Sequence, residues 1–204
     1  MKSRVPVILL ALLLLLSLWS IIHPHDMQVW WTEMASVILL LGALMATHRV
    51  IAFSNTAYFL LSIWCAMQII GAHYTFELVP FDTVSRLFGF ERNHYDRLAH
   101  FAVGLGGIAV AELLWLRRWV SSPRLAAGFS VVAMLAIAGL WEIVEWLYAE
   151  VDGGEAGQAF LGSQGDIWDA QKDMLLDTLG ALLAAGIFLL QLRKAAPADA
   201  APGT

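Results

Sequence analysis

Six long apolar stretches dominate this chain of 204 residues and limit what it can fold into. Each could cross about 30 Å of bilayer hydrocarbon as a helix, which satisfies its backbone hydrogen bonds within one segment. Only 14% of the residues are charged, whereas a soluble domain carries about 25%. The sequence therefore predicts an all-α fold, a polytopic membrane helical bundle with six transmembrane helices at about 5–22, 33–53, 56–73, 98–119, 124–149 and 173–192.

The basic residues beside these stretches predict the orientation of the bundle. No A-x-A-like cleavage site follows the first stretch, so we expect an uncleaved span rather than a removed signal. The basic residues predicted on the inner side are Lys2, Arg4, Arg49, Arg117, Arg118, Arg124, Arg193 and Lys194, and those on the outer side are Arg86, Arg92, Arg97 and Lys172. The positive-inside rule then places both termini in the cytoplasm. We expect one integral membrane domain at 1–194 and a disordered Ala/Pro-rich tail at 195–204.

Two kinds of function are excluded by what the sequence lacks. It has no basic stripe of the kind that follows a phosphate backbone, so nucleic-acid binding is set aside. Cys65 is the only cysteine, so an internal disulfide and a CxxC metal or redox motif are both ruled out. We interpret Cys65 as a packing residue.

Three of the stretches carry a pair of ionisable residues near one end, three or four residues apart and so on one helix face. The pairs are Asp96 with His100, Glu142 with Glu145, and Asp173 with Asp177. A charge at the centre of a span costs about 2.5–3.5 kcal/mol on insertion scales, so three pairs need an explanation. With both termini inside, all three lie at a similar depth below the outer surface, and we expect them to meet.

Small residues continue the same helix faces toward the inner side. They are Gly104 and Gly107 in the fourth stretch, Ala138 and Gly139 in the fifth, and Ala181 and Ala184 in the sixth. Small side chains allow membrane helices to approach closely. The last three spans are therefore predicted to pack together below the ionisable pairs. The outer segment 74–97 is predicted to hold a short amphipathic segment on the membrane surface, and 150–172 is long enough to be a binding loop.

Five carboxylates and a histidine at low dielectric cannot all stay ionised without cations. One solution is a divalent ion held by Asp96, His100, Glu142, Glu145, Asp173 and Asp177. Oxygen ligands favour Mg, Ca or Mn, and the imidazole adds Zn or Fe. A second solution is ion pairing with Arg92, Arg97 or Lys172. A third is protonation, with the acids acting as general acid, general base or proton relay.

Each candidate residue receives a role in this hypothesis. Catalysis is assigned to Asp96, His100, Glu142, Asp173 and Asp177, with Glu145 and Asp169 in support; an anionic headgroup is assigned to Arg97 and Lys172, and a polar substrate or ion to Asp166 and Asp169. Purely structural roles are the alternative. Asp96 and Asp173 suit first-turn positions that favour the helix dipole, Glu145 could reach the interface, and His100 could be a hydrogen-bonded packing residue.

Three motifs in the second half of the chain resemble a known family. They are NHYDRLAHF at 93–101, WEIVEW at 141–146 and QGDIWDAQKDMLLDTLGA at 164–181, and together they are similar to the YjdF-type bacterial inner-membrane proteins. The run from Asp96 to Phe101 also resembles, more distantly, the Asp-Lys-x-x-His-Phe signature of VanZ-like membrane proteins, with Arg97 in place of Lys. The first resemblance implies a multi-pass protein of the bacterial cytoplasmic membrane, and the second implies a cell-envelope role.

The leading hypothesis is a metal-assisted enzyme that acts on a lipid or lipid-linked envelope substrate. A proton- or ion-coupled transporter is one alternative, because carboxylates within membrane spans also mark translocation routes. A non-enzymatic membrane assembly or envelope-tolerance factor is another. The sequence contains no Ser-His-Asp pattern, Walker loop or HExxH motif that would name a reaction, and the expected partner is the lipid bilayer, with the oligomeric state left open.

Overall fold

The computed structural model describes residues 3–152, 154, 157, 161 and 163–195, and this part of the chain contains helices and no strands. The long helices are α1 (Val5–Ser20), α2 (Met27–Thr47), α3 (Asn55–Tyr74), α5 (Tyr95–Leu105), α6 (Gly107–Leu116), α7 (Pro123–Asp152) and α9 (Asp169–Ala195). Two short helices, η1 (Phe76–Leu78) and α4 (Asp82–Phe88), follow α3. The predicted all-α fold is confirmed. The expected disorder of the tail concerns residues 196–204, which lie outside the described part.

Within the described residues, five segments are long and apolar enough to cross a membrane: 27–47, 55–74, 95–116, 123–151 and 169–194. The first helix, α1, is equally apolar but has only 16 residues, a length of about 24 Å at 1.5 Å per residue. A multi-pass membrane bundle is therefore the observed architecture, with α1 shorter than the five spans that follow it.

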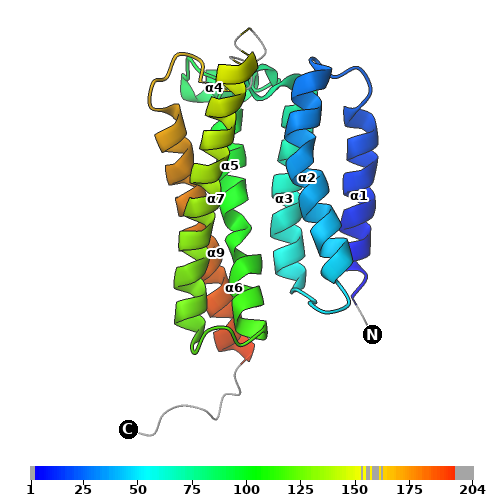
Figure 1. Cartoon of the computed structure of the whole chain (residues 1–204), viewed down its shortest axis with the longest axis vertical. Coiled ribbons are helices and arrows are strands. Elements are labelled where there is room, and N and C mark those ends of the chain that lie inside the picture. Colours follow the sequence, from blue (N-terminus) through cyan, green and yellow to red (C-terminus); the bar gives the residue numbers. More distant parts are fainter. Residues whose placement is uncertain (1–2, 153, 155–156, 158–160, 162, 196–204) are drawn as a thin grey trace, which may run out of the picture.

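The long helices run side by side in two groups (Figure 1). In the first group, α1 and α2 each pack against α3; in the second, α5, α6 and α7 surround α9, and α3 joins the groups through its contact with α5. The start of α1 and the end of α9 lie at the same end of the bundle, and α4 lies across the opposite end (Figure 1). The starts of α5 and α9 also lie at the α4 end (Figure 1).

The second span begins six residues earlier than the sequence predicted, at Met27 rather than 33. Asp26 caps this helix, because its Oδ1 accepts hydrogen bonds from the backbone N–H of Gln28 at 2.7 Å and of Val29 at 3.0 Å. The helix ends at Thr47 instead of 53. The earlier start moves Glu33 from the first residue of the expected span into the second turn of α2, where its side chain is buried.

The spans that carry the candidate site also begin earlier than expected. The expected span 98–119 is a broken helix, α5 and α6, that starts at Tyr95, where the side-chain oxygen of Asn93 accepts the N–H of Tyr95. The last span starts at Asp169 rather than 173. Asp173 therefore lies one turn inside α9 and is 3% exposed, so it does not hold the first-turn position that was its structural alternative.

The small-residue contact predicted between the last spans exists between α5 and α9. A Cβ added at Gly104 would overlap the carbonyl oxygen of Asp177, and one added at Gly180 would overlap the carbonyl oxygen of Phe101. Ala181 and Ala184 are fully buried in the same contact region. The backbones of the two helices therefore touch, which holds the ionisable residues of α5 and α9 at a fixed distance from one another.

The amphipathic surface segment predicted in 74–97 corresponds to α4. Its apolar residues Leu87 and Phe88 are strongly exposed, and Gly89 ends the helix in the left-handed conformation with φ of 69°. An exposed apolar helix at the end of a membrane bundle suits the headgroup region of the bilayer. Cys65 is buried in α3, as expected of a packing residue.

Candidate functional site

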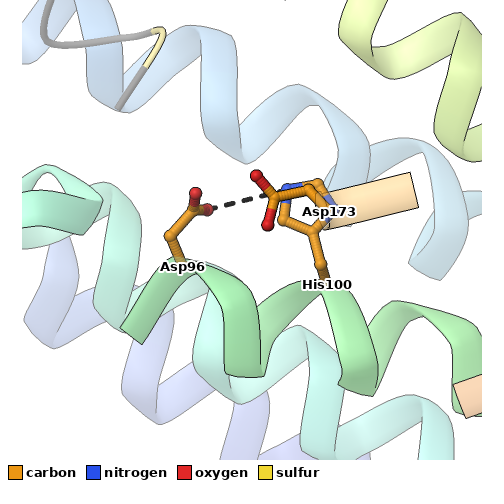
Figure 2. Close-up of side chains that lie close together, drawn as sticks. All are labelled: Asp96, His100 and Asp173. Atoms are coloured by element: carbon orange, nitrogen blue, oxygen red, sulfur yellow. Dashed lines mark ion pairs between the residues drawn. The ribbon is translucent and has the colours of Figure 1, made fainter. Parts of the chain in front are cut away.

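Three ionisable side chains converge near the starts of α5 and α9, at the α4 end of the bundle. Asp96 and His100 rise from one face of α5 toward Asp173 of α9 (Figure 2). One potential ligand atom from each of the three lies within 4.8 Å of the other two. His100 Nε2 is 3.6 Å from Asp96 Oδ1, and His100 and Asp173 are 7% and 3% exposed. The arrangement offers two carboxylates and one imidazole to a cation.

The imidazole of His100 is hydrogen-bonded to Asp177 through its Nδ1 side. Its Nδ1 lies 2.9 Å from Asp177 Oδ2, and Asp177 is fully buried. When Nδ1 carries the proton and donates it to this carboxylate, Nε2 keeps a lone pair on the side of Asp96. A carboxylate that orients the far nitrogen of a ligating histidine is the usual support of protein metal sites.

Several buried carboxylate oxygens at this place lack a hydrogen-bond partner. Among the described residues they are Oδ1 of Asp173, Oδ1 of Asp177 and Oε1 of Glu142. A buried acceptor left without a partner costs about 1–3 kcal/mol, and more when it is charged. Such groups are expected where a cation or a polar ligand supplies the missing interactions.

A cavity of about 210 Å³ adjoins the cluster, between α2 and α3 on one side and α5 and α7 on the other. Its acidic lining residues are Glu33, Asp96, Glu145 and Asp177, and its aromatic ones are Trp64, Phe76 and Trp141. His100 and Gln68 complete the polar part of the wall. The lining residues of α7 include Ile137, Leu140 and Val144, which are 49%, 62% and 39% exposed on a membrane-spanning helix. The cavity therefore reaches the lipid-facing side of the bundle.

Glu33 is the residue of this site that the sequence did not single out. It is 3% exposed, and its Oε2 accepts a hydrogen bond of 2.7 Å from Gln68 Nε2 of α3. Because the span was expected to begin at residue 33, Glu33 resembled a polar residue at the membrane boundary and was not included in the predicted site. The signal that could have found it is the Asp26 cap, which places Glu33 two turns inside the helix.

The residues predicted to bind substrate form a network of ion pairs above the cluster. Arg92 places its two terminal nitrogens 2.7 and 2.9 Å from the carboxylate oxygens of Asp169. Arg97 bonds Asp166 and Asp169, and Lys172 bonds Asp166. A two-bond contact between a guanidinium and a carboxylate is a strong, oriented interaction. These five side chains tie the start of α5 to the start of α9.

The same network shifts the pKa values of two groups outside the spans. The hydrogen bond from Lys172, followed by one from the backbone of Trp168, holds the pKa of Asp166 well below its usual range. Burial and the nearby positive charge of Arg97 lower the pKa of His94. Asp166 is therefore ionised and His94 neutral at pH 7.

The structure thus divides the predicted site residues into two layers. Asp96, His100, Asp173 and Asp177 meet in one buried cluster, and Glu145 lines the cavity beside it. Glu142 has a buried oxygen without a partner but does not belong to the three-residue group. The outer layer is the ion-pair network of Arg97, Asp166, Asp169 and Lys172, joined by Arg92.

Comparison with known proteins gives one family and one similar curated protein. The family described as "Predicted membrane protein (DUF2238)" matches residues 5–194. "Inner membrane protein YjdF" of Escherichia coli (strain K12) is 35% identical over 179 residues, which cover 87% of this chain and 85% of that protein. No solved structure matches. The resemblance to YjdF-type proteins is confirmed, and with five apolar spans the chain is a multi-pass protein of the inner membrane.

Proposed function

The chain belongs to the DUF2238 family of membrane proteins, and we propose that it is a metal-assisted enzyme acting on a lipid or lipid-linked envelope substrate. Asp96, His100 and Asp173 bind one divalent ion in this proposal. The observation that carries it is the bond from His100 Nδ1 to Asp177. That bond leaves Nε2 free to act as a ligand within reach of two carboxylates.

The donor set narrows the choice of metal. One imidazole nitrogen with two carboxylate oxygens suits Zn, Fe or Mn better than Ca, which prefers oxygen ligands alone. Three protein ligands leave further coordination positions for water or substrate, as in catalytic rather than structural sites. A metal bound there would supply a Lewis acid for a carbonyl or phosphoryl oxygen, or an activated water.

The cavity beside the cluster supports a substrate that arrives from the bilayer. Its wall includes Ile137, Leu140 and Val144, apolar residues exposed on a membrane-spanning helix. A molecule with hydrocarbon chains can therefore bring its polar end to Asp96 and His100 without leaving the lipid. A water-soluble substrate would instead have to pass the ion-pair network at the outer end.

The topology we propose has six spans with both termini in the cytoplasm. Among the described residues, seven basic ones lie in segments on the α1-start side, as the positive-inside rule requires of a cytoplasmic face. Of the four basic residues at the α4 end, Arg92, Arg97 and Lys172 are paired with acids. The cluster then lies near the extracytoplasmic face, where envelope substrates are found.

Elemental analysis of detergent-purified protein tests whether the protein binds a metal ion. Wild type should carry close to one Zn, Fe or Mn per chain. The variant His100→Ala lacks one metal ligand and should lose most of the bound metal. The variant His25→Ala, changed at an exposed position before α2, should keep the metal. Folded wild type without stoichiometric metal would remove the proposal.

Reaction on a lipid is tested by incubating the protein with an envelope lipid extract. The composition of the extract before and after incubation is then measured by mass spectrometry. One lipid class should change with wild type and metal, and stay constant with chelator or with His100→Ala. A metal-loaded protein that alters no lipid class would contradict the enzymatic part.

A further inference from the structure

The cavity beside the cluster of Asp96, His100 and Asp173 has an acidic and aromatic lining that includes no lysine or arginine. Four carboxylates line it, from Glu33, Asp96, Glu145 and Asp177. Three aromatic side chains share the wall, from Trp64, Phe76 and Trp141. From this lining we infer, on the basis of the proposed function, that the cavity binds an organic ammonium group and that the substrate is an amine-bearing amphiphile.

A buried acceptor without a partner points independently to a ligand. Asp177 is 0% exposed and lines the cavity, and its Oδ1 has no hydrogen-bond partner while Oδ2 contacts His100. Asp177 thus supports the histidine with one oxygen and leaves the other available. An ammonium group has N–H or polarised C–H donors and a positive charge, which are what such an oxygen lacks.

Glu33 supplies the second buried carboxylate, from the opposite wall. Gln68 occupies its Oε2, while the residue as a whole is only 3% exposed. The two buried acids come from α2 and α9, the two helix groups of the bundle. A cation between them would be neutralised from both sides, which a single acidic cluster on one helix would not provide.

The aromatic walls distinguish an organic cation from a second metal ion. The face of an indole or phenyl ring attracts an ammonium group lying within about 6 Å of its centroid. A metal ion would instead need converging ligands. Among the described residues, only Asp96, His100 and Asp173 form such a group, and Glu33 and Glu145 do not belong to it.

The size of the cavity agrees with an organic group. Its volume of about 210 Å³ is far above the roughly 15 Å³ that one water needs, and an apolar cavity of about 150 Å³ admits benzene. The apolar residues of α7 at the lipid-facing side leave room for hydrocarbon beyond the charged group. Both a lipid amine headgroup and a free amine share the chemistry required.

Binding is tested on the full chain in nanodiscs, with tryptophan fluorescence and calorimetry as readouts. One arm titrates ethanolamine and tetramethylammonium into protein held in phosphatidylglycerol. The other exchanges that lipid for phosphatidylethanolamine and repeats the titration. Saturable binding of a free amine in the first arm supports the inference. Loss of that binding in the second arm identifies the lipid headgroup as the source. Persistence identifies a free amine as the ligand and would contradict the amphiphilic substrate.

Two cavity variants, one control variant and a neutral probe make the test specific. Glu33→Gln can still accept the hydrogen bond from Gln68, so the fold is kept, and it should weaken amine binding at least tenfold. Glu145→Gln should weaken it as well, whereas Glu150→Gln, at an exposed position of α7, should not. The uncharged alcohol 3,3-dimethylbutanol, which has a tert-butyl group in place of a trimethylammonium group, should not bind.

Metal content, measured on the same samples, separates this inference from the proposed function. Glu33→Gln should retain the metal of wild type, since Glu33 lies outside the three-residue cluster. Amine binding without stoichiometric metal would support the ammonium site and remove the metal enzyme. Metal-loaded wild type that binds the amines in neither arm, or Glu33→Gln that binds them as wild type does, would overturn the ammonium site.

Discussion

At the scale of single residues, Asp177 has the most specific role. It is fully buried, its carbonyl oxygen touches α5 at Gly104, and its carboxylate orients His100. A carboxylate selects the proton position of the imidazole, because it accepts only from a nitrogen that carries hydrogen. An amide at the same position can donate instead and would favour the opposite tautomer, with Nε2 protonated.

Asp177→Asn should therefore weaken metal binding by about 10–100-fold while the protein remains folded. The measurement is a metal titration against a chelating competitor, with circular dichroism as the check on folding. Asp82→Asn, the same change at an exposed position of α4, is the matched control and should bind metal as wild type does. Equal affinities for Asp177→Asn and wild type would show that Asp177 does not support the histidine.

At the scale of helices, the approach of α5 to α9 decides whether the cluster can form. The contact depends on Gly104 and Gly180, whose missing side chains let each backbone reach the other. Above it, Arg92 and Arg97 tie α5 to Asp166 and Asp169 near the start of α9. The cluster of Asp96, His100 and Asp173 therefore lies between a tight backbone contact and an ion-pair network.

Gly104→Ala should destabilise the bundle by about 1–3 kcal/mol, the usual cost of overpacking. The new Cβ meets backbone atoms of Asp177 and Ala181, which cannot move aside as a side chain would. Thermal unfolding in detergent measures the effect. Gly128→Ala, where the added Cβ meets nothing within 4 Å, should be neutral or slightly stabilising. Equal destabilisation by both changes would contradict the role given to the α5–α9 contact.

The ion-pair network predicts a pH dependence that involves Asp166. Its pKa is lowered in the folded protein, mainly by Lys172, so its contribution to stability is present above the ordinary aspartate pKa of about 3.9 and is lost as pH falls through the lower folded value. Asp166→Asn should therefore unfold more easily than wild type at pH 7, with the difference vanishing in strong acid. A difference that grew on acidification would contradict this sign.

The sequence predicted the pairing of elements better than their ends. Hydropathy located the five long spans, since an apolar run is fixed by the thickness of the bilayer. It placed α2 and α9 too late because polar first turns, such as the one after Asp26, resemble loops. For the same reason Glu33 was missed, although the convergence of Asp96, His100, Asp173 and Asp177 was anticipated. The Arg92–Asp169 pair required the structure, because no periodicity predicts a contact between a loop residue and the start of a distant helix.

At the scale of the whole molecule, the residues of the candidate site lie together at one end of the bundle. The cluster and the cavity lie near the starts of α5 and α9, and the opposite part of the α5–α9 contact is closed by Ala181 and Ala184. A transporter would require polar groups to continue across the bilayer. The packing below the cluster instead suits a site that receives its substrate from one face or from the lipid.

The proposed orientation is tested by labelling introduced cysteines in a Cys65→Ser background. Leu87→Cys, exposed on α4, should react with a membrane-impermeant maleimide in intact spheroplasts. Ser121→Cys, exposed between α6 and α7, should react only after permeabilisation. The reverse pattern would place the cluster on the cytoplasmic side and exclude the envelope substrate.

The most direct test of the central claim is anomalous X-ray diffraction from crystals of the purified protein grown with Zn or Mn. We predict one strong anomalous peak between Asp96, His100 and Asp173, at about 2.0–2.2 Å from His100 Nε2 and from a carboxylate oxygen of each aspartate. His100→Ala crystals should lack that peak. A metal-containing crystal with these three side chains ordered and no peak between them would contradict the account.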